Sequence, residues 1–483
     1  YFLFKLKNKS ISLTSAITPI IILVIMLSYN IMVFGDNSLN GSNQFILLIG
    51  GFIAAIFGFK NKVSYKIMIN KIAENIQSVT GAILILLFVG ALAGTWLISG
   101  VIPAMIYYGL KILNPTLFLP ACIILCAIIS LATGSSWTTS ATVGIALIGI
   151  GKALGLPAGM IAGSVISGAY FGDKLSPLSD TTNLAPAMAG GDLFSHIRYM
   201  TLTTVPSIII TLIVFFILGF IQKSAGNSDT EPLMFAIKEK FNINLLLFIV
   251  PITVIVLIIK KSPPLIALLT GTLLGGVFAI IFQENLILEI SNSNKLTFEN
   301  SYKTIINSMT ISTQVNTSND LLNELFISGG MSGMLNTIWL IICALVFGGI
   351  MDAIGALDKI SQSLLNWAKS TFQLFASTVA SCLTINLTAS DQYLSIVIPG
   401  KMFKKAYKNR NLKSENLSRT LEDSGTVTSV LIPWNTCGAY QSGVLGVNVL
   451  DYFVYAIFNW VSPFMTLLYA YFNIKIKYII NSK

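Results

Sequence analysis

Long apolar segments separated by short polar stretches are the feature that most constrains this chain. Residues 17–34, 202–220 and 263–282 are examples, and each is close to the roughly 20 residues that a helix needs to cross a bilayer. Of the 483 residues, 54% are hydrophobic and only 10% are charged, which is far outside the range of soluble globular proteins. Because lipid leaves no partner for free backbone groups, the sequence predicts an all-α polytopic membrane protein with about ten to twelve membrane segments.

The basic residues are distributed in a way that predicts the topology. A net charge of +10 is compatible with nucleic-acid binding, but the lysines fall in short stretches between apolar runs, above all in residues 60–71 and 401–413. This pattern fits the positive-inside rule better. We therefore predict that both termini and these two stretches are cytoplasmic, and that residues 283–332, which are polar and net acidic, form an extracytoplasmic linker without chemistry.

The five cysteines do not indicate a disulfide framework, because their number is odd and they lie in apolar or motif-like stretches. Cys122 and Cys126 would share one face of a helix. The single histidine, His196, and the lack of a second cysteine pair leave no complete zinc site, so we interpret the pair as close helix packing.

Residues 168–192 combine charge, hydroxyl groups and prolines between apolar runs, with the sequence GAYFGDKLSPLSDTTNLAPAMAGGD. An ionisable group at membrane depth is costly unless it has partners or water, so this motif is a candidate functional site. Pro177 and Pro186 flank Asp180 and are expected to break the helix there. A broken helix would free backbone carbonyls that can bind a cation.

A second set of motifs repeats this pattern in the later half of the chain. Residues 134–141 are rich in hydroxyls, as is the stretch 388–391, and residues 417–438 repeat the order of the first motif: Leu-Ser, Asp, hydroxyls, Pro, Gly. One half follows a predicted cytoplasmic stretch and the other follows the predicted external linker. The halves therefore run in opposite senses, which predicts an inverted-topology duplication with broken helices or re-entrant hairpins.

This organisation divides the chain into four parts. We predict an N-terminal helical hairpin with a cytoplasmic loop (1–79), a first transporter repeat with connecting helices (80–282), the polar linker (283–332) and a second repeat (333–483).

Three long stretches resemble the signatures of the NhaC-type sodium/proton antiporter family, within the ion-transporter superfamily. They read FGDKLSPLSDTTNLAPAMAGGDLFSHI, LTASDQYLSIVIPGKMFKKAY and NLSRTLEDSGTVTSVLIPWNTCGAY. The resemblance implies a secondary transporter of the bacterial inner membrane that exchanges sodium for protons by alternating access and serves pH homeostasis. It implies no enzyme activity and no cofactor beyond the transported ions. The family also resembles malate/lactate exchangers and amino-acid carriers, which are the alternative substrates.

Sodium prefers several hard oxygen ligands, and the motifs supply them. The candidate ion-binding residues are Asp180, Thr181, Thr182, Asn183, Asp391, Asp423, Thr426, Asn435, Thr436, Ser135 and Ser136. Of these, Asp180, Asn183 and Asp423 are predicted to hold the sodium ion, with Asp180 and Asp423 close together near the midplane. A carboxylate that holds either sodium or a proton would couple the two fluxes.

Each candidate also has a structural interpretation. The three aspartates Asp180, Asp391 and Asp423 could instead cap broken helix ends. Asp173 beside Lys174 is interpreted as an ion pair or a cap, and Glu422 is ambiguous. His196 could be a pH sensor, but a single interfacial histidine near Arg198 is more often structural.

Other functional classes agree less well with the sequence. An intramembrane aspartyl protease would need a Gly-x-Gly-Asp motif, and Tyr170 stands where its first glycine would be. A channel would need a continuous pore and no titratable broken-helix motifs. We predict that the arginines Arg198, Arg410 and Arg419 are all interfacial or cytoplasmic, which favours inorganic cations over carboxylate substrates.

The resemblance is compatible with a homodimer.

Overall fold

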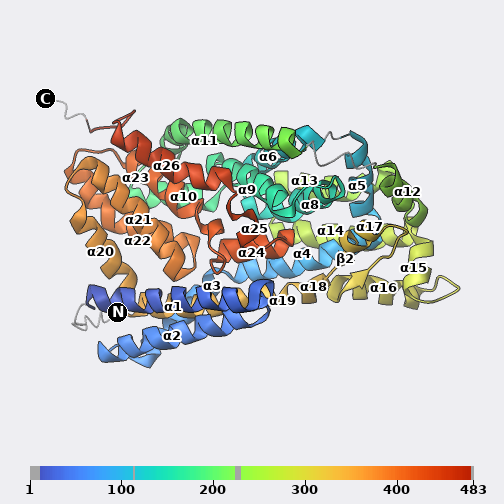
Figure 1. The fold of residues 1–483 in the computed structure, drawn as a ribbon, viewed down its shortest axis with the longest axis horizontal. Coiled ribbons are helices and arrows are strands. Elements are labelled where there is room, and N and C mark those ends of the chain that lie inside the picture. The colour runs from blue at the N-terminus through green and yellow to red at the C-terminus, as the bar shows by residue number, and fades with distance from the viewer. Residues whose placement is uncertain (1–10, 113–114, 223–229, 480–483) are drawn as a thin grey trace.

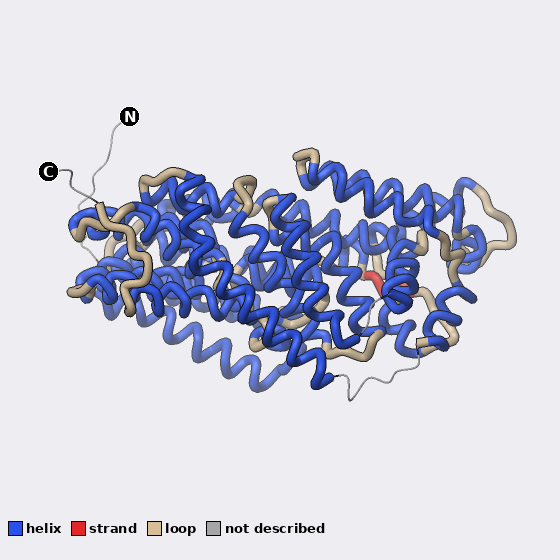
Figure 2. Tube along the Cα trace, turned by 90° about the horizontal axis from the view of Figure 1, so that it is seen from above, coloured by secondary structure: helices blue, strands red, loops and turns tan. Residues whose placement is uncertain are grey.

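The computed structural model describes residues 11–112, 115–222 and 230–479, and this part of the chain is almost entirely helical (Figures 1 and 2). The first half contains α1 (Leu13–Phe34), η1 (Gly35–Asn40), α2 (Ser42–Lys60), α3 (Tyr65–Ser78), α4 (Thr80–Ile98), α5 (Val101–Ile112), α6 (Pro115–Thr133), α7 (Ser136–Thr139), η2 (Ser140–Gly144), α8 (Ile145–Ala153), α9 (Ala158–Leu175), α10 (Asp180–Ala189), α11 (Leu193–Gln222), α12 (Glu231–Lys240), η3 (Leu245–Phe248), α13 (Ile249–Ile259) and α14 (Pro264–Phe282). The second half contains α15 (Glu284–Ile290), α16 (Phe298–Thr310), β1 (Thr313–Gln314), α17 (Asp320–Leu325), β2 (Ile327–Ser328), α18 (Gly330–Gly333), α19 (Leu335–Ala353), α20 (Ala356–Trp367), α21 (Thr371–Ala389), α22 (Gln392–Asn409), α23 (Ser414–Leu421), η4 (Glu422–Thr426), η5 (Ser429–Leu431), α24 (Thr436–Leu445), α25 (Val449–Phe453) and α26 (Ile457–Tyr471).

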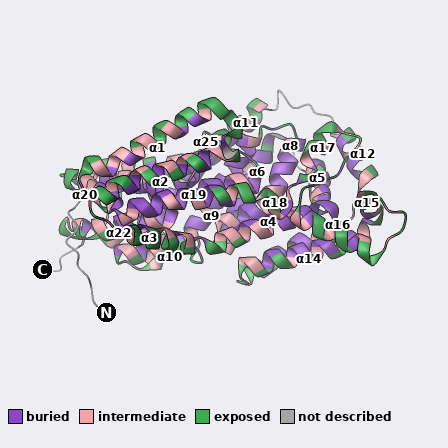
Figure 3. Cartoon of the chain, turned by 90° about the horizontal axis from the view of Figure 1, so that it is seen from below, coloured by how far each residue is buried: buried purple, intermediate pink, exposed green. Residues whose placement is uncertain are grey.

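Eight helices of the described part are long and apolar enough to cross a membrane, and a ninth span results if the bent pair of α12 and η3–α13 is counted as one. The eight are α1, α2, α4, α6, α11, α14, α18–α19 and α21. Their outer faces carry exposed leucine, isoleucine and phenylalanine, as on α1 and α11, whereas the middle of the bundle is buried (Figure 3). An exposed apolar belt of this kind requires lipid. The prediction of an all-α polytopic membrane protein is confirmed.

The basic stretch after α2 is mostly helical rather than a loop. It contains α3, an amphipathic helix whose Lys71 contacts Glu74 at 2.9 Å and Asp352, near the end of α19, at 3.3 Å. Gly349 lets α3 lie close against α19, because a Cβ atom at that position would be 2.8 Å from Cα of Ile72.

Residues 283–332 are more ordered than the sequence indicated. They form α15 to α18 and a small antiparallel pair of β1 and β2, with Thr313 opposite Ser328. Gly90 and Gly94 of α4 face the backbone carbonyls of Gly330 and Ser308, and neither site has space for a Cβ atom. Glycines of α4 therefore bring this segment onto the bundle, which is the close packing expected of small residues in membrane helices.

The beginning of α1 and the end of α26 lie at the same end of the elongated molecule as α20, whereas α12 and α15 lie at the other (Figure 1). The basic segment after α22 joins the C-terminal stretch through two backbone hydrogen bonds, Lys413 N to Lys477 O (3.0 Å) and Ile479 N to Asn411 O (2.7 Å). The start of α1, the end of α26 and the basic segment after α22 thus share one end. The direction in which that end faces stays a prediction.

Candidate ion-binding site

Two helix breaks of the first half place polar side chains at the starts of short helices. After α6, Gly134 adopts a left-handed conformation (φ +71°) and Ser135 caps α7 by accepting from Thr138 N at 3.1 Å. After α9, Ser179 caps α10 by accepting from Thr182 N at 3.4 Å. The predicted break is present at Pro177, and Asp180 is the first residue of the new helix, whereas Pro186 lies inside α10 and does not break it.

Two breaks of the second half have similar local geometry. After α21, Ser390 is left-handed (φ 59°) and Asp391 caps α22, with its Oδ1 atom accepting from Leu394 N at 2.9 Å. After α23 the chain passes through η4 and η5, and Asn435 caps α24 by accepting from Cys437 N at 3.0 Å. A left-handed residue followed by a capping residue thus occurs at positions 134–135 and again at 390–391.

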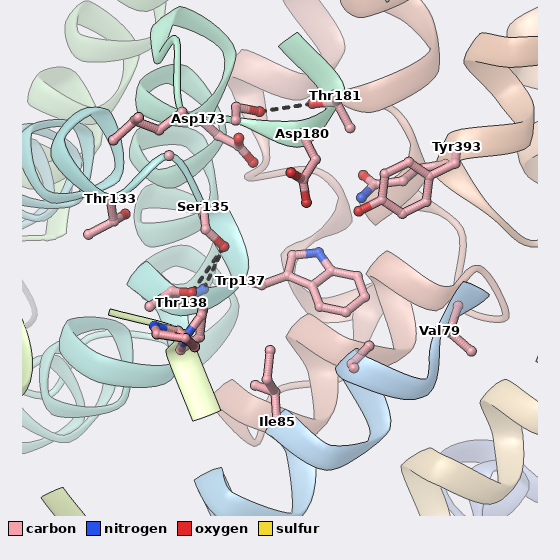
Figure 4. A pocket seen from close by; sticks show the side chains of 18 of the residues that line it. Val79, Ile85, Thr133, Ser135, Trp137, Thr138, Asp173, Asp180, Thr181 and Tyr393 are labelled. Carbon is pink, nitrogen blue, oxygen red and sulfur yellow. Dashed lines mark hydrogen bonds between the residues drawn. The ribbon is translucent and has the colours of Figure 1, made fainter. Parts of the chain in front are cut away.

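All four new helix starts border one cavity of about 560 Å³ (Figure 4). Ser135, Asp180, Asp391 and Thr436 line it, one from each break. The cavity extends to the α13–α14 turn at Lys261, which is exposed. Helix N-termini carry partial positive charge, so they stabilise ionised carboxylates placed at them.

The carboxylates of the cavity differ in how they are satisfied. Asp173 accepts from Ser136 through N (3.0 Å) and Oγ (2.6 Å), so it holds the start of α7. Asp391 is only 2% exposed, and its second oxygen, Oδ2, has no hydrogen-bond partner among the described residues. Asp180 is exposed to the cavity and its carboxylate points toward Trp137 in Figure 4. Among the described residues, Oδ2 of Asp391 and the exposed carboxylate of Asp180 are therefore the oxygen atoms available to a cation in this cavity.

Asp423 is not among the residues that line this cavity, although Asp180 is. Its Oδ1 atom forms an ion pair with Lys174, and its Oδ2 atom accepts from Thr203 (2.8 Å) and from Thr466. Lys174 and Asp423 are both fully buried. The structure thus satisfies Asp423 with a protein cation and two hydroxyls, so a sodium ion at Asp423 would compete with Lys174.

The other predicted ligands divide between the cavity wall and the helix breaks behind it. Thr181 lines the cavity with Asp180. Thr182 donates to the carbonyls of Asp173 and Lys174, both at 3.2 Å, and Asn183 donates to those of Pro177 (2.9 Å) and Ser179 (2.7 Å). These bonds hold the end of α9 and the start of α10 together.

The remaining second-half candidates are buried beside the last break. Asn435 donates to the carbonyl of Asn386 at 3.1 Å, which ties α24 to α21. Thr426 is buried in η4, and its Oγ1 atom lacks a hydrogen-bond partner in the described chain. Neither residue lines the cavity.

Sequence reasoning left Glu422 open and did not identify Arg419 as an interior residue. Glu422 is fully buried and accepts from Thr181 at 3.0 Å, so it lies directly behind the cavity wall. Arg419 is also fully buried, with its guanidinium carbon 4.3 Å from the ring centre of Tyr199 and 5.7 Å from that of Tyr469. None of its nitrogens has a hydrogen-bond partner among the described residues. Its position four residues before Asp423, on one helical face, was the available signal.

Arg419 and His196 are both buried side chains of the second-half break and its neighbour α11. We expected every arginine to be interfacial or cytoplasmic, and Arg419 is buried inside the protein, on Tyr199, whose hydroxyl donates to the Lys475 carbonyl. Its depth in the membrane stays a prediction, and so does the inference against carboxylate substrates. His196 fits its structural interpretation, since it is buried and its Nδ1 atom lies 2.8 Å from Ser418 Oγ.

Comparison with known proteins agrees with this architecture. Residues 168–474 match the model of the "Na+/H+ antiporter family". The chain is 38% identical to the Na(+)/H(+) antiporter NhaC of Alkalihalophilus pseudofirmus, over 87% of this chain and 88% of that protein. It is 36% identical to the malate-2H(+)/Na(+)-lactate antiporter of Bacillus subtilis (89% of both chains) and 32% identical to the arginine/ornithine antiporter ArcD of Halobacterium salinarum (96% and 93%). The chain belongs to the Na+/H+ antiporter family, as a member of its NhaC group.

Proposed function

We propose that this sodium/proton antiporter of the bacterial inner membrane binds its ions in the cavity between the four helix breaks, at Asp180 and Asp391. The observation that carries the proposal is the Oδ2 atom of the buried Asp391, which has no hydrogen-bond partner among the described residues, in a cavity that Asp180 also lines. A buried carboxylate oxygen without a partner is costly, so a bound cation or proton is the natural way to satisfy it. Hydroxyls of Ser135, Thr181 and Thr436 on the same wall supply further hard oxygens.

Coupling follows from competition at these carboxylates. Sodium and a proton each neutralise the same negative charge. Binding of one therefore lowers the affinity of the site for the other. Release of one ion on one side and capture of the other on the opposite side then gives exchange without a covalent step. The similar breaks of the two halves support a site between inverted repeats that is exposed alternately to each side.

The test of this function is ion flux in everted vesicles. We expect added sodium to dissipate a preformed pH gradient, with little response to malate or to amino acids. Vesicles that lack the protein provide the baseline. A pH response that needs malate and is absent with sodium alone would contradict the proposal.

Organic acid exchange is the second candidate, and Arg419 is the observation that favours it. A buried guanidinium without a hydrogen-bonded anion suits a carboxylate substrate, because arginine binds carboxylates in a bidentate manner. The malate-2H(+)/Na(+)-lactate antiporter of Bacillus subtilis is a relative of comparable identity. The acidic cavity favours cations, and Arg419 is not among its lining residues, so sodium remains the main proposal.

Membrane orientation gives a separate prediction. We expect both termini and residues 401–413 to be cytoplasmic and residues 283–332 to face outward. The reason is that lysines are concentrated in residues 401–413 and near the termini. On a background without the five cysteines, Lys295→Cys should react with an impermeant reagent from outside and Lys405→Cys only from inside; both positions are exposed. Labelling of position 295 only from the cytoplasmic side would reverse the orientation and remove the charge argument for inverted repeats.

A further inference from the structure

The cavity is much larger than a sodium ion requires. Its volume of about 560 Å³ lies within the range of roughly 300–1,000 Å³ that is usual for pockets of small organic ligands. One water molecule takes up about 30 Å³ of liquid, so a single ion would leave most of this space to solvent. A water-filled access path to the ion site would also have such a volume. The side chains that line the cavity therefore have to show which ligands it can bind.

Aromatic side chains face the carboxylates across the cavity. Trp137 and Tyr393 both line it, and Figure 4 shows the Asp180 carboxylate directed into the space between them. One face of the Trp137 indole is stacked on Tyr440, with ring centres 4.1 Å apart and an interplanar angle of 18°. The other side of the indole is therefore left to the cavity. An aromatic face beside a carboxylate is the arrangement that binds organic ammonium groups.

The charges of the residues that line the cavity disfavour anions. Three carboxylates line the cavity, Asp173, Asp180 and Asp391, against one basic residue, Lys261 at the α13–α14 turn. Asp173 is already satisfied by Ser136, whereas Asp391 is buried and keeps one oxygen without a partner in the described chain. An anion would meet this negative field at close range, and a monovalent cation would relieve it.

We propose that the cavity also binds small organic ammonium ions, up to about the size of choline, in competition with sodium. The cationic head group would lie between Asp180 and Asp391, with Trp137 and Tyr393 covering its methyl groups. This inference rests on the proposed ion site, because the same carboxylates serve both ligands. It adds a class of ligand that the volume and the aromatic wall accommodate and that an ion-sized site would reject.

The experiment measures choline binding to the purified protein by isothermal titration in sodium-free buffer, and repeats it in the presence of sodium. We expect saturable binding that weakens as sodium rises. Trp137→Leu should weaken choline binding by about 3- to 30-fold, the range expected for loss of one cation–π contact, and Trp137→Phe should retain most of it. Loss in both variants to the same extent would assign Trp137 a packing role and contradict the aromatic contact.

The outcomes separate this inference from the proposed function. No choline binding together with normal sodium/proton exchange would overturn the inference and leave the function intact. Choline binding that sodium does not weaken would place the ligand elsewhere and overturn the inference as well. Absence of both choline binding and sodium exchange would contradict the ion site on which the inference depends.

Discussion

Asp180→Asn is expected to abolish sodium-coupled proton movement while the protein still inserts and purifies normally. The amide keeps the size of the side chain and removes its charge and its proton exchange. Ser179 supplies the N-cap bond of α10, so the helix start does not depend on the Asp180 carboxylate. Loss of one charged contact worth about 1.5–3 kcal/mol would by itself weaken sodium binding roughly 10- to 150-fold, and coupling is lost altogether because the amide no longer exchanges a proton for sodium. The measurement is the initial rate of pH-gradient dissipation against sodium concentration in everted vesicles.

Asp192→Asn is the matched control. Asp192 belongs to the same motif and accepts from Ser195 N at 2.9 Å at the start of α11, but it is exposed and does not line the ion cavity. Asparagine can also cap a helix, so this variant should exchange ions at the normal rate. Full antiport activity in Asp180→Asn would refute the central assignment. Equal loss in both variants would show that any substitution in the motif disturbs folding.

Asp391→Asn separates capping from ion binding at the second carboxylate. The Oδ1 atom of Asp391 caps α22, and asparagine performs this role about as well as aspartate. A purely structural Asp391 would therefore tolerate the change. Because its Oδ2 atom is buried and unpartnered in the described chain, we expect antiport to weaken strongly.

The membrane fold could be read from the sequence because it depends on local properties. Apolar runs of helical length act within a few residues of themselves, as does Pro177 before Asp180, and α1, α11 and α14 contain or closely match the runs 17–34, 202–220 and 263–282. The order of residues 283–332 was missed for the opposite reason. It depends on Gly90 and Gly94 meeting carbonyls more than 200 residues later in the chain, and no local pattern predicts which surface a small residue contacts.

The residue types around the proposed ion site could be predicted from the sequence, but their hydrogen-bond and ion-pair partners could not. The motifs identified Asp180, Asp391, Thr436 and Ser135, which the structure brings to one cavity. The sequence also grouped Asp423 with them, because the motif around it has the same order as the first. It could not show that Lys174, adjacent to Asp173, pairs instead with Asp423. Adjacent residues on a helix point in different directions, so sequence neighbours are poor guides to ion pairs.

The pair of Lys174 and Asp423 connects α9 of the first half with η4 of the second, and its removal should have a large effect on stability. Lys174→Met leaves a buried carboxylate without its cation, and Asp423→Asn leaves a buried ammonium without its ion-pair partner, beside the Phe458 ring at 5.3 Å. Breaking a buried pair on one side costs on the order of 3–5 kcal/mol. We expect either variant to unfold at a clearly lower temperature, measured by thermal unfolding in detergent.

Lys240→Met is the control, because it removes an ion pair that is exposed to solvent rather than buried. Lys240 contacts Glu289 at 2.6 Å, but the Glu289 side chain is 59% exposed, and exposed pairs contribute only about 0–1 kcal/mol. This variant should unfold close to the temperature of the unmodified protein. If Lys174→Met behaves like Lys240→Met, the buried pair does not stabilise this conformation.

The double variant Lys174→Met/Asp423→Asn decides what Asp423 does in transport. Removing both charges should restore most of the lost stability, because neither member of the pair is left as a charge without its partner and the amide oxygen can still accept from Thr203 and Thr466. A stable double variant that still exchanges sodium for protons would make Asp423 a structural partner of Lys174 and confine the ion site to Asp180 and Asp391. A stable double variant without exchange would mean that transport requires the Lys174–Asp423 charges themselves, so that sodium entry involves displacement of the Lys174 ammonium from Asp423.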